Sequence, residues 1–337
     1  METLINKYTK LNNSFKKTFV FHIGFDAGFF SEYNNMIFAM LYCLENQIKF
    51  TLYSRDANFK YKNGWEDYFE PFCEERTENF HHKYNVRAMF NPIQIVKFCA
   101  KQKYPLKKWL ANIVKSCIYT IKTNVYLLLK KYFQSKYDFH YLMFELWHHF
   151  RNEDFTNTNF LIPQLGINGN LQEACRVLVQ LTWRYNAKTK NNVENLIKQL
   201  HLPANYIGLH IRSGDKIKEA NLYQPLAYIE KASMYSNTEN IFVLTDNYQI
   251  INEVKAQRQT VYTLCEENER GYFHADFGKN KPEQIRKSHE KLFASIDILS
   301  QSEIFVGTFS SNPGVYLGMR MDKIKIVAVD YDEWKMI

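Results

Sequence analysis

The chain has 337 residues, 46% of them hydrophobic, and a formal net charge of +8. This length favours two packed domains that share a cleft, and 12 glycines and 8 prolines are too few for low-complexity linkers. The sequence shows no secretory signal and no run of about 18 uncharged apolar residues, so we expect a cytoplasmic protein.

The first elements predicted along the chain form a β-α-β unit. Residues 18–23 are β-prone and end in a glycine turn at 24–28, and an apolar periodic stretch follows at 31–44. Residues 48–53 restore the strand pattern. Because strands joined by a helix pair in parallel, this part predicts an α/β domain. Residues 60–166 are aromatic-rich and mostly helical in pattern.

A second α/β block begins after residue 200. Its predicted elements are strands at 206–212, 240–245 and 303–308 and a helix at about 284–300. Near-continuous apolar runs in the last two strands are typical of strands covered on both faces. We therefore predict an α/β fold of two Rossmann-like domains, 1–200 and 201–337, with a ligand between them at the carboxyl ends of strands.

The strand predicted at 206–212 ends abruptly in polar residues. Arg212 and Lys216 stand four residues apart at this strand tip. They can bind a diphosphate there. The arginine would donate two hydrogen bonds to it, and the lysine would act as a point charge. An ion pair between Arg212 and Asp215 that merely stabilises the turn explains the same residues.

A second polar segment follows the strand predicted at 303–308. Ser310, Ser311 and Asn312 are residue types found at helix N-caps, and Pro313 suits the first helical turn. The free N–H groups of a helix N-terminus form a seat for phosphate. An ordinary helix cap is the alternative.

Three further acidic positions have more than one interpretation. Asp246 ends the strand predicted at 240–245, where it can accept from a ribose or sugar hydroxyl or form a turn. Asp297 stands among apolar neighbours in the sequence. Such a carboxylate either accepts a hydrogen bond from the edge of a purine base or is a buried structural partner. The pair in Asp330-Tyr331-Asp332 lacks the strand-loop context of a metal site. We therefore expect no metal ligands.

Two segments together resemble a known family. Residues 206–220 and 295–318 are similar to the donor domain of the α-1,6-fucosyltransferases of N-glycan cores and the nodulation-factor fucosyltransferases. That family has His-Val-Arg-Arg-Thr-Asp-Lys followed by Glu-Ala, and later Thr-Phe-Ser-Ser-Gln. This chain has His-Ile-Arg-Ser-Gly-Asp-Lys from His210, then Glu219-Ala220, and Thr-Phe-Ser-Ser-Asn from Thr308. The resemblance implies a type B glycosyltransferase fold and inverting transfer of fucose from GDP-fucose to a glycan hydroxyl.

The resemblance also implies a role for each matched residue. The donor diphosphate would be bound by Arg212, Thr308, Ser310, Ser311 and Asn312, and the guanine by His210 and Asp297. Glu219 would be the general base, although one residue is deleted before it, and Lys216 would lie beside it. Gly28, in the glycine turn, would approach the donor from the other domain. No cofactor is implied, and Arg212, Lys216 and the helix start would make a metal unnecessary.

The basicity of the chain is local, because residues 101–136 hold nine lysines and no acid, which exceeds the whole net charge. Within 107–132 an apolar face is predicted on a helix. The lysines that fall on the opposite face are Lys108, Lys115, Lys122 and Lys130. A surface helix packed on its own core explains this pattern. The alternative is contact with the anionic inner face of a membrane, which would suit a glycolipid acceptor.

Other functions stay open at this point. A related transferase with another nucleotide sugar would need the same diphosphate seat. A catalytically silent sugar-nucleotide binder or membrane-surface protein is compatible with Ser213, which replaces the family's second arginine. A nucleic-acid partner is disfavoured, because residues 101–136 contain no arginine.

Overall fold

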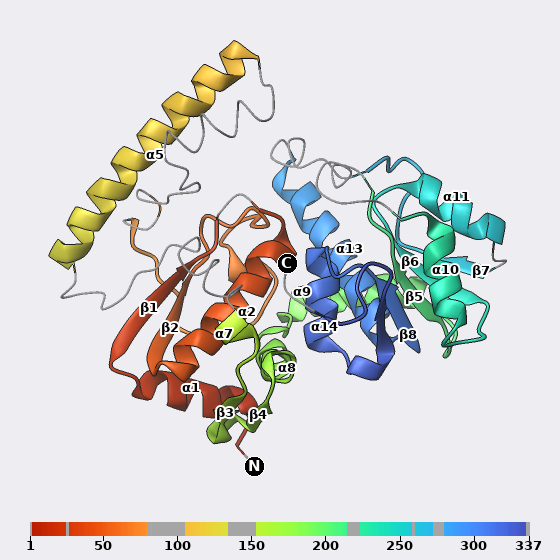
Figure 1. Ribbon diagram of the computed structural model, residues 1–337, viewed down its shortest axis with the longest axis horizontal. Helices are drawn as coiled ribbons and strands as arrows, with labels where there is room; N and C mark the ends of the chain where they lie inside the picture. Colours follow the sequence, from red (N-terminus) through yellow and green to blue (C-terminus); the bar gives the residue numbers. More distant parts are fainter. Residues whose placement is uncertain are drawn as a thin grey trace.

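Two separate parallel sheets organise the computed structural model, with the helices α9, α13 and α14 between them (Figure 1). The structure describes residues 2–24, 27–79, 82, 105–133, 153–213, 223–257, 260–271 and 280–334.

The predicted β-α-β unit forms the smaller sheet. Strand β1 (Lys17–His22) pairs in parallel with β2 (Ile48–Tyr53), and α2 (Phe29–Glu45) connects them. Helix α1 (Leu4–Ser14) precedes β1, and Asn12 on it exchanges hydrogen bonds with the backbone of Phe50 on β2 at 2.8 and 2.9 Å. Most of α2 is buried, so it is a central core helix rather than a surface one.

The described part of residues 60–166 contains one long helix and several short elements. Its elements are the 3-10 turn η1 (Trp65–Asp67), α5 (Leu106–Phe133), α7 (Glu153–Thr156), β3 (Phe160–Ile162), η2 (Pro163–Leu165) and β4 (Ile167–Gly169). Strands β3 and β4 form an antiparallel hairpin that the sequence analysis did not predict. Gly166 allows the reversal, because it has a left-handed φ of 71°. Helices α8 (Leu171–Thr182) and α9 (Ala187–Gln199) follow, each begun by an asparagine N-cap.

The larger sheet has five parallel strands in the order β7-β6-β5-β8-β9. The strands are β5 (Ile207–His210), β6 (Asn240–Leu244), β7 (Thr260–Tyr262), β8 (Ile304–Gly307) and β9 (Ile326–Ala328). The helices are α10 (Pro225–Ser233), α11 (Tyr248–Gln257), α13 (Pro282–Gln301) and α14 (Asn312–Arg320), with a 3-10 turn η4 (Lys323–Lys325) before β9. Counted within this half, the order is 3-2-1-4-5, which is the Rossmann order and confirms the predicted class.

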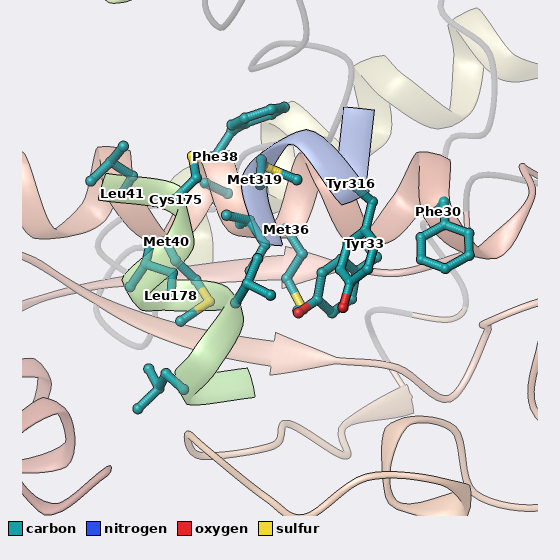
Figure 2. Close-up of a cluster of buried hydrophobic side chains, with 14 of the residues drawn as sticks. Phe30, Tyr33, Met36, Phe38, Met40, Leu41, Cys175, Leu178, Tyr316 and Met319 are labelled. Carbon is teal, nitrogen blue, oxygen red and sulfur yellow. The ribbon is translucent and has the colours of Figure 1, made fainter. Parts of the chain in front are cut away.

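One hydrophobic core joins the two halves. Residues of α2, α8 and α14 interdigitate in Figure 2, where Tyr33 lies beside Tyr316. Their ring centroids are 5.3 Å apart, and the Tyr33 hydroxyl is 2.7 Å from the Thr182 hydroxyl. The boundary predicted near residue 200 thus divides the two sheets but not the core, and two separate folding units stay a prediction.

Helix α5 confirms the helix predicted at 107–132 but not the packing of its apolar face. The outward side chains include Leu110, Val114, Ile118 and Ile121, which are exposed. Figure 1 shows α5 standing away from both sheets. The explanation by packing on a core is therefore wrong for these side chains.

Candidate donor site

A cavity of about 680 Å³ lies where the strand order of the larger sheet reverses. The reversal falls between β5 and β8, and in open α/β sheets ligands bind beyond the strand ends at this point. The volume is that of a site for a small organic ligand. The predicted site residues that line it are Gly28, His210, Arg212, Asp246, Ser311 and Asn312.

Arg212 leaves the end of β5 and forms an ion pair across the strand ends. Its Nη1 lies 3.3 Å from Oδ2 of Asp246, which follows β6. The other carboxylate oxygen of Asp246 accepts the Ser213 N–H at 3.0 Å. Asp246 therefore orients the guanidinium beside the cavity, in addition to any contact with a sugar hydroxyl. Its partnership with Arg212 was not predicted.

His210 is the last residue of β5, and its ring lines the cavity although only 4% of the residue is exposed. Burial, aided by the nearby charge of Arg212, lowers the pKa of His210 to about 3, so the imidazole is neutral near pH 7. Among the described residues nothing hydrogen-bonds its Nδ1. Buried polar atoms are rarely left so, and we infer that a ligand atom is the missing partner.

The segment after β8 begins helix α14 at the cavity. Ser311 is the N-cap, and its hydroxyl accepts the Gly314 N–H at 3.4 Å and donates to the Thr308 carbonyl at 2.9 Å. A Cβ at Gly314 would lie 1.9 Å from that carbonyl, so only glycine allows this tight first turn. Ser311, Asn312 and Pro313 at the start of α14 thus line the cavity, and their contact with a phosphate stays a prediction.

A second helix starts at the same cavity from the other half of the chain. Gly28 is the N-cap of α2 and has no side chain to cap it, and Phe29 and Phe30 of the first turn also line the cavity. The Asn34 side chain of α2 donates to the Asn312 carbonyl at 2.9 Å, which ties the two helix starts together. Two helix N-termini therefore direct positive potential into one space, which favours an anionic ligand.

The side-chain charges of the cavity are otherwise balanced. Lys291 on α13 is hydrogen-bonded to Glu269, and Arg212 forms its ion pair with Asp246. His289 also lines the cavity, and burial lowers its pKa to about 4 despite its backbone hydrogen bond. Its ring lies 6.2 Å from that of Phe59, giving the cavity an aromatic wall on which a planar base can stack.

Asp330 holds the segment between β8 and α14 in place. Its two carboxylate oxygens accept the N–H groups of Phe309 and Ser310 at 2.9 and 2.8 Å. From the sequence, this carboxylate was interpreted only as one member of a metal-binding pair. No local pattern signals its role, because its partners lie about twenty residues earlier in the chain.

The variant Asp330→Asn is expected to weaken GDP binding about tenfold, because a charge-assisted hydrogen bond is lost and an amide group then faces a backbone N–H. Isothermal calorimetry measures the affinity. Asp332→Asn is the matched control, since Asp332 is exposed. Equal losses in both variants, reversed by divalent metal, would instead support a metal pair.

The other predicted residues lie away from the cavity lining. Asp297 accepts from Arg320 at 2.6 Å and from Trp183 at 3.1 Å through one oxygen. Thr308 is buried, and the backbone N–H of Ser310 points to Asp330. Their donor contacts stay predictions. Lys216 and Glu219, the predicted catalytic pair, lie outside the described residues.

A buried carboxylate supports the rim of the cavity on the side of the smaller sheet. Asp56 accepts from Nε2 of His22 at 2.9 Å and from Nδ1 of His82 at 2.7 Å. Burial opposes its ionisation, but the two imidazoles outweigh burial and hold the pKa of Asp56 well below its usual range. Asn58, two residues on, lines the cavity and donates to the Ala27 carbonyl at 3.2 Å.

Asp56→Asn is expected to lower the free energy of unfolding by about 2–3 kcal/mol at pH 7. Because the folded-state pKa is depressed, this stabilisation is present above the unfolded-state pKa of about 4 and disappears as the pH falls towards the folded-state pKa. Urea unfolding at pH 7 and at a series of lower pH values should show the full difference from wild type at pH 7, and a difference that shrinks steadily as the pH falls below about 4. A difference independent of pH would contradict this assignment.

Within the described ranges, no group of three or more His, Cys, Asp or Glu side chains could hold a metal ion. The donor set around the cavity is instead suited to an anion, through arginine and backbone N–H groups.

Comparisons with known proteins agree with this geometry. Residues 175–314 match the family model described as alpha-(1,6)-fucosyltransferase N- and catalytic domains. The matched stretch contains β5, β6, β8 and the start of α14, and therefore the cavity residues of the larger sheet. No curated protein matches the chain by sequence.

Solved structures share the fold at low identity. NodZ alpha-1,6-fucosyltransferase soaked with GDP-fucose superposes with a TM-score of 0.51 at 12% identity, over 91% of this chain and 93% of its own. The Se-Met form of fucosyltransferase NodZ from Bradyrhizobium gives 0.50 and 12%, over 91% and 92%. These two structures confirm the type B fold. Over residues 175–314 and in its fold, the chain is therefore similar to fucosyltransferases of the type B glycosyltransferase class.

Proposed function

We propose that the protein transfers fucose from GDP-fucose to a glycan hydroxyl with inversion at the anomeric carbon. The observation that carries the proposal is the unpartnered Nδ1 of buried His210 in a cavity that is also lined by two helix N-termini and by Arg212. A nucleoside diphosphate offers both an anionic group for the helix starts and polar edges for the histidine. That the NodZ structure was soaked with GDP-fucose supports the choice of donor.

The proposed reaction is a single displacement. The acceptor oxygen forms a bond to C1 of fucose while the bond from C1 to the β-phosphate oxygen breaks, and the acceptor proton passes to a base. By resemblance that base is Glu219. Arg212 and the N-termini of α2 and α14 stabilise the negative charge that develops on the departing GDP. We propose that this charge compensation replaces a divalent metal.

Ligand-dependent thermal stability tests the donor assignment. GDP and GDP-fucose are expected to raise Tm by the same amount with and without EDTA, whereas UDP and CMP are not, because only ligands of the native state stabilise it. His210→Phe keeps the ring volume but removes both ring nitrogens, and it should reduce the shift with GDP. A preference for UDP would indicate another nucleotide sugar, and donor binding without turnover on any glycan would indicate a silent binder.

A further inference from the structure

Helix α5 exposes a continuous apolar stripe. Its members are Leu106, Leu110, Val114, Ile118, Ile121 and Val125, with exposed fractions between 38% and 69%. The steps of three or four residues keep all six on one side of an α-helix. They make up half of the large hydrophobic side chains that are exposed among the described residues. Such a patch indicates an interaction site.

The stripe lies on a different side of α5 from the side chains that are buried or half-buried. Ser116 is buried and Trp109 and Ile113 are half-buried, and these three positions lie about a quarter of a turn or more from the centre of the stripe. The stripe therefore faces outward while another side of the helix is in contact with the protein. Figure 1 shows α5 at the outer edge of the molecule, so the stripe is sterically accessible.

Lysines accompany the stripe. Lys108 and Lys115 are exposed and lie two turns apart, about a third of a turn around the helix from the centre of the stripe, and Lys122 continues the same register. Residues 101–136 contain nine lysines and no acid. A matching surface must therefore offer apolar groups to the stripe and anionic groups to the lysines. A second α5 offers no anionic groups and would bring two lysine rows together.

An anionic lipid surface meets both requirements, because acyl chains accept the apolar stripe and headgroups accept the lysines. We propose that α5 is an interfacial helix that docks the enzyme on an anionic bilayer, with the six stripe residues inserted at the boundary between headgroups and acyl chains. No helix in the described part of the chain is long and apolar enough to span a membrane. The proposed attachment is peripheral and independent of the donor assignment.

Cosedimentation of the full chain with vesicles tests the proposal. The probe is phosphatidylcholine containing about one quarter phosphatidylglycerol, compared with phosphatidylcholine alone. Binding is expected only to the anionic vesicles and should weaken between about 0.1 M and 0.5 M salt, as the charges are screened. The double variant Val114→Asn/Ile118→Asn should lose at least about tenfold in vesicle affinity. Lys108→Glu/Lys115→Glu should lose at least as much.

Two matched double variants control for general effects. Leu226→Asn/Met234→Asn removes exposed apolar side chains outside α5, and Lys190→Glu/Lys198→Glu makes the same charge change on α9. Both should bind vesicles as wild type does. Circular dichroism and the Tm shift with GDP should be unchanged in all four, which separates a failure here from a failure of the proposed donor.

The absence of vesicle binding by the wild type, or equal losses in the stripe and control variants, would overturn the proposal. A change from dimer to monomer in the stripe variant during sedimentation, without vesicle binding, would assign the stripe to a second copy of the chain instead.

Discussion

Arg212→Ala is expected to lower kcat about 100- to 1,000-fold, the usual cost of removing one preorganised donor to developing charge. The guanidinium lines the cavity and is oriented by Asp246 at 3.3 Å, so its loss removes a charge-assisted contact and leaves the negative charge of Asp246 beside the donor phosphates. GDP affinity should fall as well, because the leaving group keeps its charge in the ground state. Steady-state kinetics and calorimetry measure both effects.

Arg176→Ala is the matched control for this variant. The Arg176 side chain is 25% exposed, close to the 27% of Arg212, and it pairs with Asp322 at 3.0 Å away from the cavity. It should keep wild-type kinetics. Arg212→Lys should recover only part of the turnover, since an ammonium cannot make two parallel hydrogen bonds to a phosphate. Wild-type kinetics in Arg212→Ala would remove Arg212 from the mechanism.

Asp297→Ala is expected to cost about 3–5 kcal/mol of folding free energy, the range for breaking a buried ion pair by removing one partner. Asp297 accepts from Arg320 at 2.6 Å, and the guanidinium lies 5.5 Å from the Trp183 ring centre, within the core shared by both halves. Without Asp297, the Arg320 charge would be left largely uncompensated in that core. Denaturant unfolding measures the loss.

The same variant decides between the two interpretations of Asp297. Asp322→Ala removes an exposed ion pair and should cost less than about 1 kcal/mol. If Asp297 is a structural partner, the folded variant should bind GDP with wild-type affinity under stabilising conditions. A variant as stable as wild type that binds GDP weakly would identify Asp297 as the guanine ligand implied by the family resemblance.

Local patterns were sufficient for the elements that build the donor cavity. The apolar runs that end at His210 and Gly307 mark β5 and β8, and polar residues directly after them mark strand tips. All strands of a parallel sheet have their carboxyl ends at the same edge of the sheet. Two such strand tips therefore lie close together when the strands are neighbours. For the same reason His210, Arg212, Ser311 and Asn312 could be placed in one site from the sequence.

Residues whose roles depend on distant partners could not be placed in this way. Asp330 lies about twenty residues along the chain from Phe309 and Ser310, whose N–H groups it binds. Asp246 follows β6, whereas its partner Arg212 follows β5. The partners of Asp297, which are Arg320 and Trp183, also lie elsewhere in the chain, so its local sequence could not identify them. Periodicity reports which face of an element is apolar, but not which side chains meet across the fold.

Helix α5 shows the same division. Its sequence determined that residues 107–132 form an amphipathic, lysine-rich helix, because spacing at 3.6 residues per turn is a local property. Whether Val114 and Ile118 are buried depends on what lies opposite them, and only the tertiary structure decided that they face outward. The sequence thus determined the strands β1, β2, β5, β6 and β8, the start of α14 and the local basicity of this protein. The tertiary structure decided which carboxylate holds which backbone and which apolar face is left exposed, because those contacts form between residues far apart in the chain.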